Sequence, residues 1–352
     1  MRTGEVLRAV REHAPGLPLT VVASAEERVC RRAAGEPVAF RRVRLDVGVV
    51  QGDALSQDEA ATAEAWARFH HTYDERVAAE ARWLRESGTR LVLADVPPLA
   101  FDAAARAGVP AVALTNFSWD WVYRHLARRE PRLEKAADHA ARAYGQAELL
   151  LELPFAGDLS AFPRRERIPL VARPPRRPRE EVRRHLGLGE RARVVLVTFG
   201  GIGVPGFDLR ALALLSEFTF LATEGRGTDG ANVRFVDLDL LDAEGYLYRD
   251  LVTAADVVLT KPGYGIVTDA IASGTRIVYT ERGDFPEYPI LAAAMADWIP
   301  SVHVSNDLLR AGHVRPALEG ALALALPPLP PLDGAGVAAR RLLEVAGLVG
   351  SA

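Results

Sequence analysis

The stretch Ala255-Asp256-Val257-Val258-Leu259-Thr260-Lys261-Pro262-Gly263-Tyr264-Gly265-Ile266-Val267-Thr268-Asp269-Ala270-Ile271-Ala272-Ser273-Gly274 decides the fold. An apolar, β-branched run passes directly into a glycine turn, and the turn passes into a helical segment. A buried strand, a tight turn and a helix form the unit from which parallel sheets are built. Glycines let backbone N–H groups approach an anion closely, and the dipole of the following helix favours a diphosphate there. The stretch therefore predicts an anion-binding turn at the end of a buried strand.

The same unit of strand, turn and helix recurs on both sides of this stretch. In the second half we expect strands over residues 194–199, 218–222, 233–236, 257–260 and 276–280, and helices that begin near residues 207, 246, 265 and 289. In the first half we expect strands over residues 19–23, 38–45, 91–94, 111–114 and 149–153, with a long helical stretch between residues 57 and 87. This alternation predicts an α/β protein with doubly wound parallel sheets.

Proline and arginine dominate a stretch between the two halves. Residues 162–184 hold five prolines and nine arginines, a composition typical of a linker. We therefore expect an N-terminal domain over residues 1–165, a linker over 166–180, a C-terminal domain over 181–330 and a terminal segment with a helix over 331–352. The arginines from Arg164 to Arg184 also form a candidate patch for an anionic membrane surface.

Length and composition narrow the classes of protein. The 352 residues suffice for two domains, and 49% hydrophobic with 25% charged residues is typical of a folded chain. The net charge of −3 provides no general field for nucleic acid, so we expect no nucleic-acid partner. The single cysteine, Cys30, excludes an intrachain disulfide and a Cys-rich metal site, and the histidines lack metal-ligand spacing, so we expect no metal site. No apolar run reaches the roughly 20 residues of a membrane-spanning helix, and we expect a cytoplasmic protein.

A second glycine cluster, Phe199-Gly200-Gly201-Ile202-Gly203-Val204-Pro205-Gly206, also follows an expected strand. It contains G-x-G-x-x-G, and Glu224 lies where a dinucleotide-binding fold keeps its ribose-binding acid. The cluster makes an NAD(P)-dependent oxidoreductase an alternative. Pro205 weighs against it, because proline removes a backbone donor from the turn. A simple tight turn is the other interpretation.

Two residues of the first stretch carry charges suited to a nucleotide. Lys261 is one of only two lysines in an arginine-rich chain, which suggests a compact ammonium at a phosphate or sugar, although chance explains it equally well. Asp269, in the first helical turn, has a carboxylate suited to both hydroxyls of a ribose. An acid that stabilises the helix dipole is the alternative interpretation of Asp269.

Polar and aromatic residues follow other expected strands. Asp284 and Glu287 follow residues 276–280 and are suited to sugar hydroxyls, or to capping the next helix. In the first half, residues 115–123 combine four aromatic side chains with asparagine and aspartate. They predict a stacking platform for a sugar ring, with core packing as the alternative. Asp95 follows residues 91–94 and is a candidate general base or a turn residue.

Joined together, the stretches 257–274, 276–289 and 116–123 resemble those of GT-B glycosyltransferases. The blocks Asn116-Phe117-Ser118-Trp119-Asp120 and Lys261-Pro262-Gly263-Tyr264-Gly265 resemble the N-terminal glycosyltransferase-like region of plant L-arabinokinases. A more distant resemblance is to the transferase that adds N-acetylglucosamine to the lipid-linked peptidoglycan precursor. The resemblance implies two Rossmann-like domains that face each other across a cleft, with a terminal helix that crosses back to the first domain.

The resemblance also implies a division of roles between the domains. The C-terminal domain binds a nucleotide-sugar donor, with UDP among the candidates, and no further cofactor. The donor-binding residues are Gly200, Gly201, Lys261, Gly263, Tyr264, Gly265, Asp269, Asp284 and Glu287. The acceptor-binding residues of the N-terminal domain are Asn116, Trp119, Asp120 and Tyr123.

The sequence departs from this family at its beginning. Relatives start with a strand and a G-H-G-x-G-H-A-x-R loop, whereas this sequence begins within that pattern and Arg2 matches its last residue. We therefore expect the first parallel strand to be missing, and the chain to be less stable than a version extended upstream.

The combined expectation is a glycosyltransferase that moves a sugar from a nucleoside diphosphate to a hydroxyl acceptor without a metal ion. Asp95 is the expected base. One alternative is a catalytically silent nucleotide-sugar-binding protein, which the missing loop favours. The other is the NAD(P)-dependent oxidoreductase.

Overall fold

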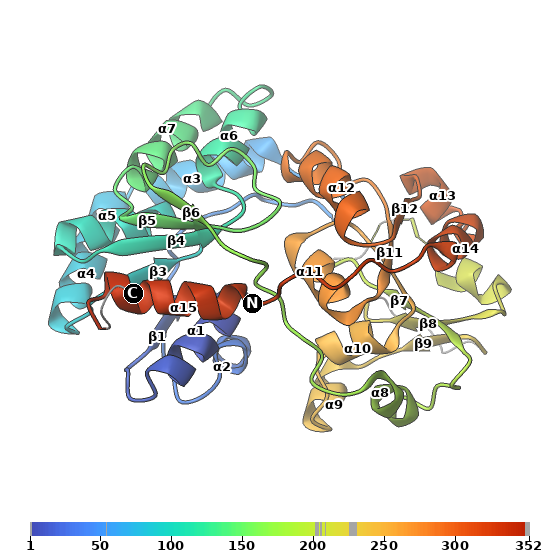
Figure 1. Ribbon diagram of the computed structural model, residues 1–352. Coiled ribbons are helices and arrows are strands. Elements are labelled where there is room, and N and C mark those ends of the chain that lie inside the picture. Colours follow the sequence, from blue (N-terminus) through green and yellow to red (C-terminus); the bar gives the residue numbers. More distant parts are fainter. Residues whose placement is uncertain are drawn as a thin grey trace. The chain divides into compact units, whose positions relative to one another are not determined.

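The computed structural model describes residues 2–53, 55–200, 204, 206–207, 209–224 and 231–348, which form two units (Figure 1). Unit 1 comprises Met1–Val50, Asp58–Ala172 and Pro331–Ala352, and unit 2 comprises Gln51–Gln57 and Arg173–Pro330. The strands pair in parallel throughout both units, as the alternation of strands and helices predicts.

Unit 1 contains two separate parallel sheets. One sheet pairs β1 (Thr20–Ala23) with β2 (Ala39–Arg42), and the other has the order β3 (Val92–Ala94), β4 (Ala111–Thr115), β5 (Leu149–Glu152) and β6 (Arg165–Arg167). β6 lies partly in the stretch expected to be a linker. The helices are α1 (Arg2–His13), α2 (Glu27–Ala34), α3 (Glu59–His70), α4 (Tyr73–Glu86), α5 (Pro98–Ala107), α6 (Trp119–Leu126), α7 (Leu133–Tyr144) and α15 (Gly334–Val345).

The long helical stretch expected between residues 57 and 87 is two helices, α3 and α4. The chain turns at His71 and Thr72, and Thr72 has a non-helical conformation with φ −114° and ψ 24°. The periodicity of apolar residues persists across the break, because both helices contribute apolar side chains to the hydrophobic core of unit 1. The prediction of one continuous helix was therefore wrong.

Unit 2 has one six-stranded sheet with the order β12-β11-β10-β7-β8-β9. The strands are β7 (Arg193–Val197), β8 (Phe218–Ala222), β9 (Val233–Phe235), β10 (Val257–Thr260), β11 (Arg276–Tyr279) and β12 (Ser301–His303). The helices are α8 (Arg179–His185), η1 (Leu209–Leu214), α9 (Leu238–Ala243), α10 (Tyr248–Ala254), α11 (Tyr264–Ser273), α12 (Glu287–Trp298), α13 (Asn306–Arg310) and α14 (Arg315–Ala323). η1 is a 3-10 helix that starts later than the helix expected near residue 207, because Gly206 has φ +78°.

The C-terminal helix α15 belongs to unit 1 and packs against α1 (Figure 1). Val171 and Asp333 form a β-bridge, and the N–H of Gly334 donates to the carbonyl oxygen of Leu170 at 3.2 Å. The guanidinium of Arg341 donates to both oxygens of Glu166 at 2.8 Å. These contacts fix the start and the middle of α15. No helix in the described ranges is long and apolar enough to cross a membrane.

Gly334 allows the close approach at the start of α15. A Cβ atom at this position would lie 2.1 Å from the carbonyl oxygen of Pro169. We expect Gly334→Ala to lower the free energy of unfolding by about 1–3 kcal/mol, the usual cost of overpacking. Gly336→Ala, two residues further along the helix, is the matched control, because its Cβ would meet only the flexible end of Arg340 at 3.6 Å. Urea unfolding of both variants measures the difference, and equal stability would contradict the packing argument.

Candidate functional site

The sheet of unit 2 reverses its strand order between β7 and β10. From β7 the chain adds β8 and β9 on one side, and it then crosses to add β10, β11 and β12 on the other. Ligands of open parallel sheets bind outside the carboxyl ends of the strands at such a reversal. The residues that follow β7 and β10 are therefore the candidate site.

The turn after β10 presents two glycines to open space. Gly263 is the N-cap of α11 and has extended backbone, with φ −151° and ψ 148°, which any residue adopts. A Cβ atom on Gly263 or on Gly265 would meet nothing within 4 Å. Packing therefore requires glycine at neither position. The first N–H groups of a helix lack intrahelical partners, so the open space at the start of α11 is suited to an anion.

Lys261 lies beside the turns that follow both strands. It directly follows β10, and its Cε atom is 3.8 Å from where a Cβ atom on Gly200 would lie, beyond β7. Burial, and after it the positive charge of Arg282, lowers the pKa of Lys261 to about 8, against the opposing negative charges of Glu224 and Asp53. A partly buried ammonium therefore lies at the reversal of the sheet, where sequence analysis expected a phosphate contact.

Glu224 holds the backbone of the loop after β7. Both carboxylate oxygens accept a hydrogen bond from the N–H of Phe199, at 2.9 and 2.8 Å, and Thr198 Oγ1 donates to Oε1 at 3.3 Å. Tyr248 donates to Thr198 Oγ1 at 3.1 Å, and burial raises the pKa of Tyr248 to about 12. Gly200 is exposed, and Gly201 lies outside the described residues. Through these contacts Glu224 supports the backbone of the loop. The oxidoreductase alternative instead assigns Glu224 to a ribose.

Asp269 lies in a buried ion pair with Arg173. Its side chain is 1% exposed, Arg173 Nε donates to Oδ1 at 2.8 Å, and Arg173 Nη2 contacts Oδ2. Burial raises the pKa of Asp269, and the guanidinium opposes that shift. Both carboxylate oxygens thus anchor the start of the main segment of unit 2. Binding of a ribose to Asp269 stays a prediction that requires Arg173 to move.

The two acids after β11 occupy different environments. Glu287, at the start of α12, is buried and accepts a hydrogen bond from Arg282 Nη1 at 2.9 Å. Asp284 is exposed, and its main-chain carbonyl oxygen accepts a hydrogen bond from Gln57 Nε2 at 2.9 Å. The pair suggested by the sequence is therefore one surface acid and one buried ion-paired acid.

In unit 1, Arg2 brings two of the predicted residues together. Arg2 donates to both oxygens of Asp95, at 2.6 and 3.1 Å, and to Asn116 Oδ1 at 2.5 Å. Thr3 Oγ1 also donates to Asp95 Oδ2 at 3.1 Å. The expected base therefore already accepts hydrogen bonds at both carboxylate oxygens in this structure.

The aromatic residues of α6 support a neighbouring loop. Trp119 Nε1 donates to Asp46 Oδ2 at 2.9 Å, and Tyr123 donates from its hydroxyl to the carbonyl oxygen of Gly48 at 3.0 Å. The two rings stack with their centroids 5.6 Å apart. Asp120 is buried, which raises its pKa. Tyr123 and Asp120 follow the core-packing interpretation, whereas Trp119 is half-buried and keeps part of its surface accessible.

Asp46 is a candidate proton acceptor that sequence analysis missed. It follows β2 and is half-buried. Burial raises the pKa of Asp46, and the nearby negative charge of Asp95 raises it further. A carboxyl group with a raised pKa is suited to general-base chemistry. The sequence carries no signal for it, because Asp46 lies alone in the apolar run 45–50.

Most arginines between residues 164 and 184 form ion pairs with acidic side chains of the same chain. Seven of them lie within 4.0 Å of a carboxylate: Arg164, Arg165, Arg167, Arg173, Arg177, Arg179 and Arg183. Contact with an anionic membrane stays a prediction. Among the residues that the structure describes, no group of three or more His, Cys, Asp or Glu side chains is placed to hold a metal ion.

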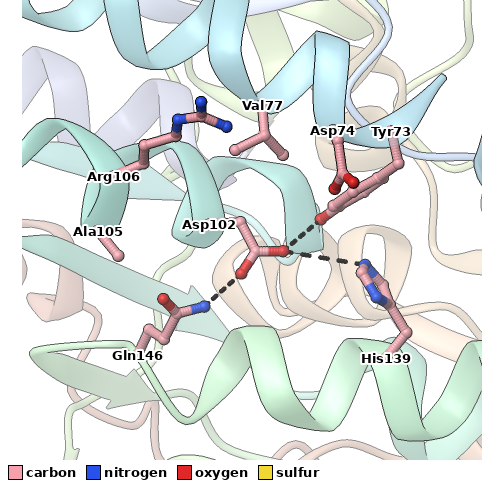
Figure 2. Close-up of a pocket in the computed structure, with 8 residues that line it drawn as sticks. All are labelled: Tyr73, Asp74, Val77, Asp102, Ala105, Arg106, His139 and Gln146. Carbon is pink, nitrogen blue, oxygen red and sulfur yellow. Dashed lines mark hydrogen bonds and ion pairs between the residues drawn. The ribbon is translucent and has the colours of Figure 1, made fainter.

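A separate cavity of about 500 Å³ lies in unit 1, and none of the predicted site residues lines it (Figure 2). Asp102 accepts a hydrogen bond from the hydroxyl of Tyr73 at 2.7 Å, and His139 Nε2 lies 3.9 Å from the same carboxylate. A second cavity of about 490 Å³ adjoins His139 and His70, whose ring centroids are 4.7 Å apart. Burial lowers the pKa of both histidines.

The chain was compared with known proteins, and no family model matches it. It is 31% identical over 309 residues to the L-arabinokinase of Arabidopsis thaliana, which covers 87% of this chain and 29% of that protein. It is 27% identical over 292 residues to an uncharacterized glycosyltransferase of Methanopyrus kandleri, covering 77% of this chain and 79% of that protein. The chain thus spans less than a third of the L-arabinokinase that it matches.

Solved structures share the fold over nearly the whole chain. The calicheamicin glycosyltransferase has a TM-score of 0.57 and 19% identity, covering 98% of this chain and 91% of its own. A UDP-glucose:anthocyanidin 3-O-glucosyltransferase in complex with UDP has a TM-score of 0.60 and 13% identity, covering 99% and 95%. A structure from Listeria monocytogenes described as a UDP-N-acetylglucosamine 2-epimerase has a TM-score of 0.57 and 11% identity, covering 97% and 91%.

The chain has the GT-B fold, and the predicted fold class is confirmed. More particularly, it is a homologue of the matched part of L-arabinokinase and of the archaeal glycosyltransferase. The archaeal homologue and two of these three structural neighbours are named as glycosyltransferases. Because the epimerase shares the fold, the finer assignment depends on the site.

Breaking the Arg173–Asp269 pair tests whether it is structural. Arg173→Ala leaves a buried carboxylate without its guanidinium, and we expect a loss of about 3–5 kcal/mol in the free energy of unfolding. The double variant Arg173→Met/Asp269→Leu removes both charges and should recover most of that loss. Urea denaturation measures both, and a single variant within 1 kcal/mol of wild type would overturn the structural role.

The histidines between the two cavities predict loss of stability in acid. Their pKa values lie below the ordinary 6.5 in the folded state, so the unfolded state binds more protons as the pH falls through that value. Stability is therefore greatest above pH 6.5 and declines below it. His139→Gln should reduce the slope of melting temperature against pH between 7.5 and 5, whereas His313→Gln, at an exposed position, should leave it unchanged. An unchanged slope for His139→Gln would remove this histidine as a cause.

Proposed function

We propose that the chain transfers a sugar from a nucleoside diphosphate sugar, held by unit 2, to a hydroxyl group of an acceptor. The homologous archaeal glycosyltransferase and the neighbouring glucosyltransferase in complex with UDP support a nucleotide-sugar donor of the UDP type. The hydroxyl acceptor, the sugar and transfer without a metal ion are parts of this proposal. Two independent features of unit 2 support the position of the diphosphate.

The main support for the diphosphate site is the open, glycine-lined start of α11 beside Lys261. Gly263 and Gly265 have no packing reason to be glycine, and the ammonium of Lys261 lies at the same reversal of the sheet. Backbone N–H groups and one positive charge match the oxygens of a diphosphate. The same groups stabilise the charge that develops on the diphosphate as it leaves the sugar.

Attack by the acceptor requires a base near its hydroxyl. In unit 1, Asp46 and Asp95 are the candidates. We favour Asp46, because burial raises its pKa and it accepts a hydrogen bond from the neutral Trp119 indole, whereas Asp95 is ion-paired with Arg2 at both oxygens. In the proposed step, the carboxylate takes the hydroxyl proton as the oxygen bonds to the anomeric carbon and the bond to the diphosphate breaks.

The second candidate function is nucleotide-sugar binding without transfer. The engagement of Asp95 by Arg2 favours it, because both oxygens of the base expected from the sequence already accept hydrogen bonds from a guanidinium. Release of free nucleoside diphosphate from a donor sugar in the presence of acceptor extracts separates the two functions. Binding without release supports the second.

Gly265→Ala tests the diphosphate site. We expect the variant to fold with stability equal to wild type or up to about 1 kcal/mol higher, because alanine favours helices, yet to bind nucleoside diphosphates at least tenfold more weakly. Gly320→Ala, inside α14, is the matched control, since its Cβ makes only an ordinary contact of 3.8 Å.

The measurement is a thermal-shift panel of UDP, dTDP, GDP, ADP, NAD and NADP. A ligand at 100 times its dissociation constant adds about 2.7 kcal/mol of stability. Stabilisation of wild type and Gly320→Ala, but not of Gly265→Ala, supports the proposal. Stabilisation by NAD or NADP alone points to the oxidoreductase alternative, and no stabilisation by any nucleotide contradicts a donor site.

The pKa of Lys261 predicts a pH dependence of binding. The site without ligand loses its ammonium as the pH rises through about 8, and a diphosphate then has to restore a proton to bind. Affinity should therefore fall by roughly tenfold per pH unit above pH 8. Lys261→Arg keeps the charge and should flatten the profile. Calorimetric titration with UDP at pH 7, 8 and 9 measures this, and a flat wild-type profile would exclude Lys261 as a phosphate contact.

A further inference from the structure

A short hairpin from the first half of the sequence belongs to unit 2. The chain leaves unit 1 after Val50 and returns to it at Asp58. The described hairpin residues are 51–53 and 55–57, with Gln51 and Gln57 joined by an antiparallel bridge. Asp53 Oδ1 accepts hydrogen bonds from the N–H groups of Leu55, at 2.7 Å, and Ser56, at 2.8 Å. The turn is thus closed by its own carboxylate.

Three contacts join the hairpin to the rest of unit 2. Leu55 is 8% exposed and is part of the hydrophobic core of the unit. Its carbonyl oxygen would lie 2.6 Å from a Cβ atom on Gly283, which has φ +59°, so both the contact and the backbone require glycine there. Gln57 Nε2 donates to the carbonyl oxygen of Asp284 at 2.9 Å. The hairpin and the loop 281–285 therefore determine each other's position.

This loop adjoins the proposed diphosphate position. It follows β11, which pairs with β10, and Lys261 follows β10. Arg282 of the loop lowers the pKa of Lys261, and Asp53 of the hairpin opposes that effect. The N–H of Leu55 lowers the pKa of Asp53, which keeps its carboxylate ionised. Hairpin, loop and Lys261 thus share one electrostatic environment.

We infer that the hairpin is the sugar-side wall of the donor site and positions the loop 281–285 for the sugar of the donor. The inference rests on the proposed function. Gln51 and Ser56 of the hairpin and Asp284 of the loop are exposed polar residues, and their side chains suit sugar hydroxyls. On the other side of Lys261, Glu224 already holds the backbone of Phe199. The consequence is selectivity for a nucleotide sugar over the bare nucleoside diphosphate.

Two variants displace the hairpin by different means. Gly283→Ala forces Leu55 away, and Gln57→Ala removes one hydrogen bond and leaves the core intact. Calorimetry with UDP and UDP-glucose, and with dTDP and dTDP-glucose, gives the ratio of affinities for each pair. We expect both variants to bind the nucleotide sugar at least fivefold more weakly, with binding of the bare diphosphate within twofold of wild type. Gly320→Ala should keep both affinities.

Hydrogen exchange of the wild-type protein provides a readout independent of folding defects. The N–H groups of Leu55 and Ser56 should gain protection when UDP-glucose binds and change little with UDP. A hairpin with only a structural role would show equal protection with both ligands.

The outcomes separate the inference from the function beneath it. If no nucleoside diphosphate binds wild type, the proposed function and this inference both fail. If UDP or dTDP binds but the variants keep the affinity ratio and the hairpin shows equal protection, the inference alone is overturned. Loss of selectivity together with sugar-dependent protection supports it.

Discussion

The candidate site of unit 2 depends on the reversal of strand order between β7 and β10. All strands of this sheet are parallel, so their carboxyl ends lie at one edge, and at the reversal the connections leave in opposite directions. This constraint brings the turn at Gly200 and the turn at Gly263 to the same part of the edge, with Lys261 beside them. The backbone topology thus forms the candidate anion site.

Arginine side chains form ion pairs with three of the acids that the sequence offers as site residues. Asp95, Asp269 and Glu287, which the sequence offers as ligands or as a base, each contact an arginine: Arg2, Arg173 and Arg282. A carboxylate taken from water needs a matched donor, and a guanidinium supplies two parallel hydrogen bonds. In an arginine-rich chain many acids are therefore structural. The glycine turn, Lys261 and the exposed Asp284 are candidate groups outside these three ion pairs.

Much of the fold could be predicted from the sequence, because apolar runs and glycine turns act over a few residues. The strand over residues 257–260, the following turn and the parallel pairing are confirmed. The break between α3 and α4 was missed because the apolar spacing continues across Thr72. β6 was missed because arginine and proline dominate residues 162–184, although the strand needs only three residues beside β5. Asp46 was missed because its raised pKa comes from burial that its neighbours in sequence do not reveal.

The sequence by itself determined the α/β class, the strand and helix units, and an open glycine turn before α11, since each depends on local backbone preference and short-range periodicity. The tertiary structure alone decided the partners of the charged groups and the place of the hairpin. Arg2 and Asp95 are 93 residues apart, Arg173 and Asp269 are 96 apart, and Gln57 and Asp284 are 227 apart. Such contacts form only when the folded chain brings the two partners together, and no pattern of neighbouring residues encodes which partner that is.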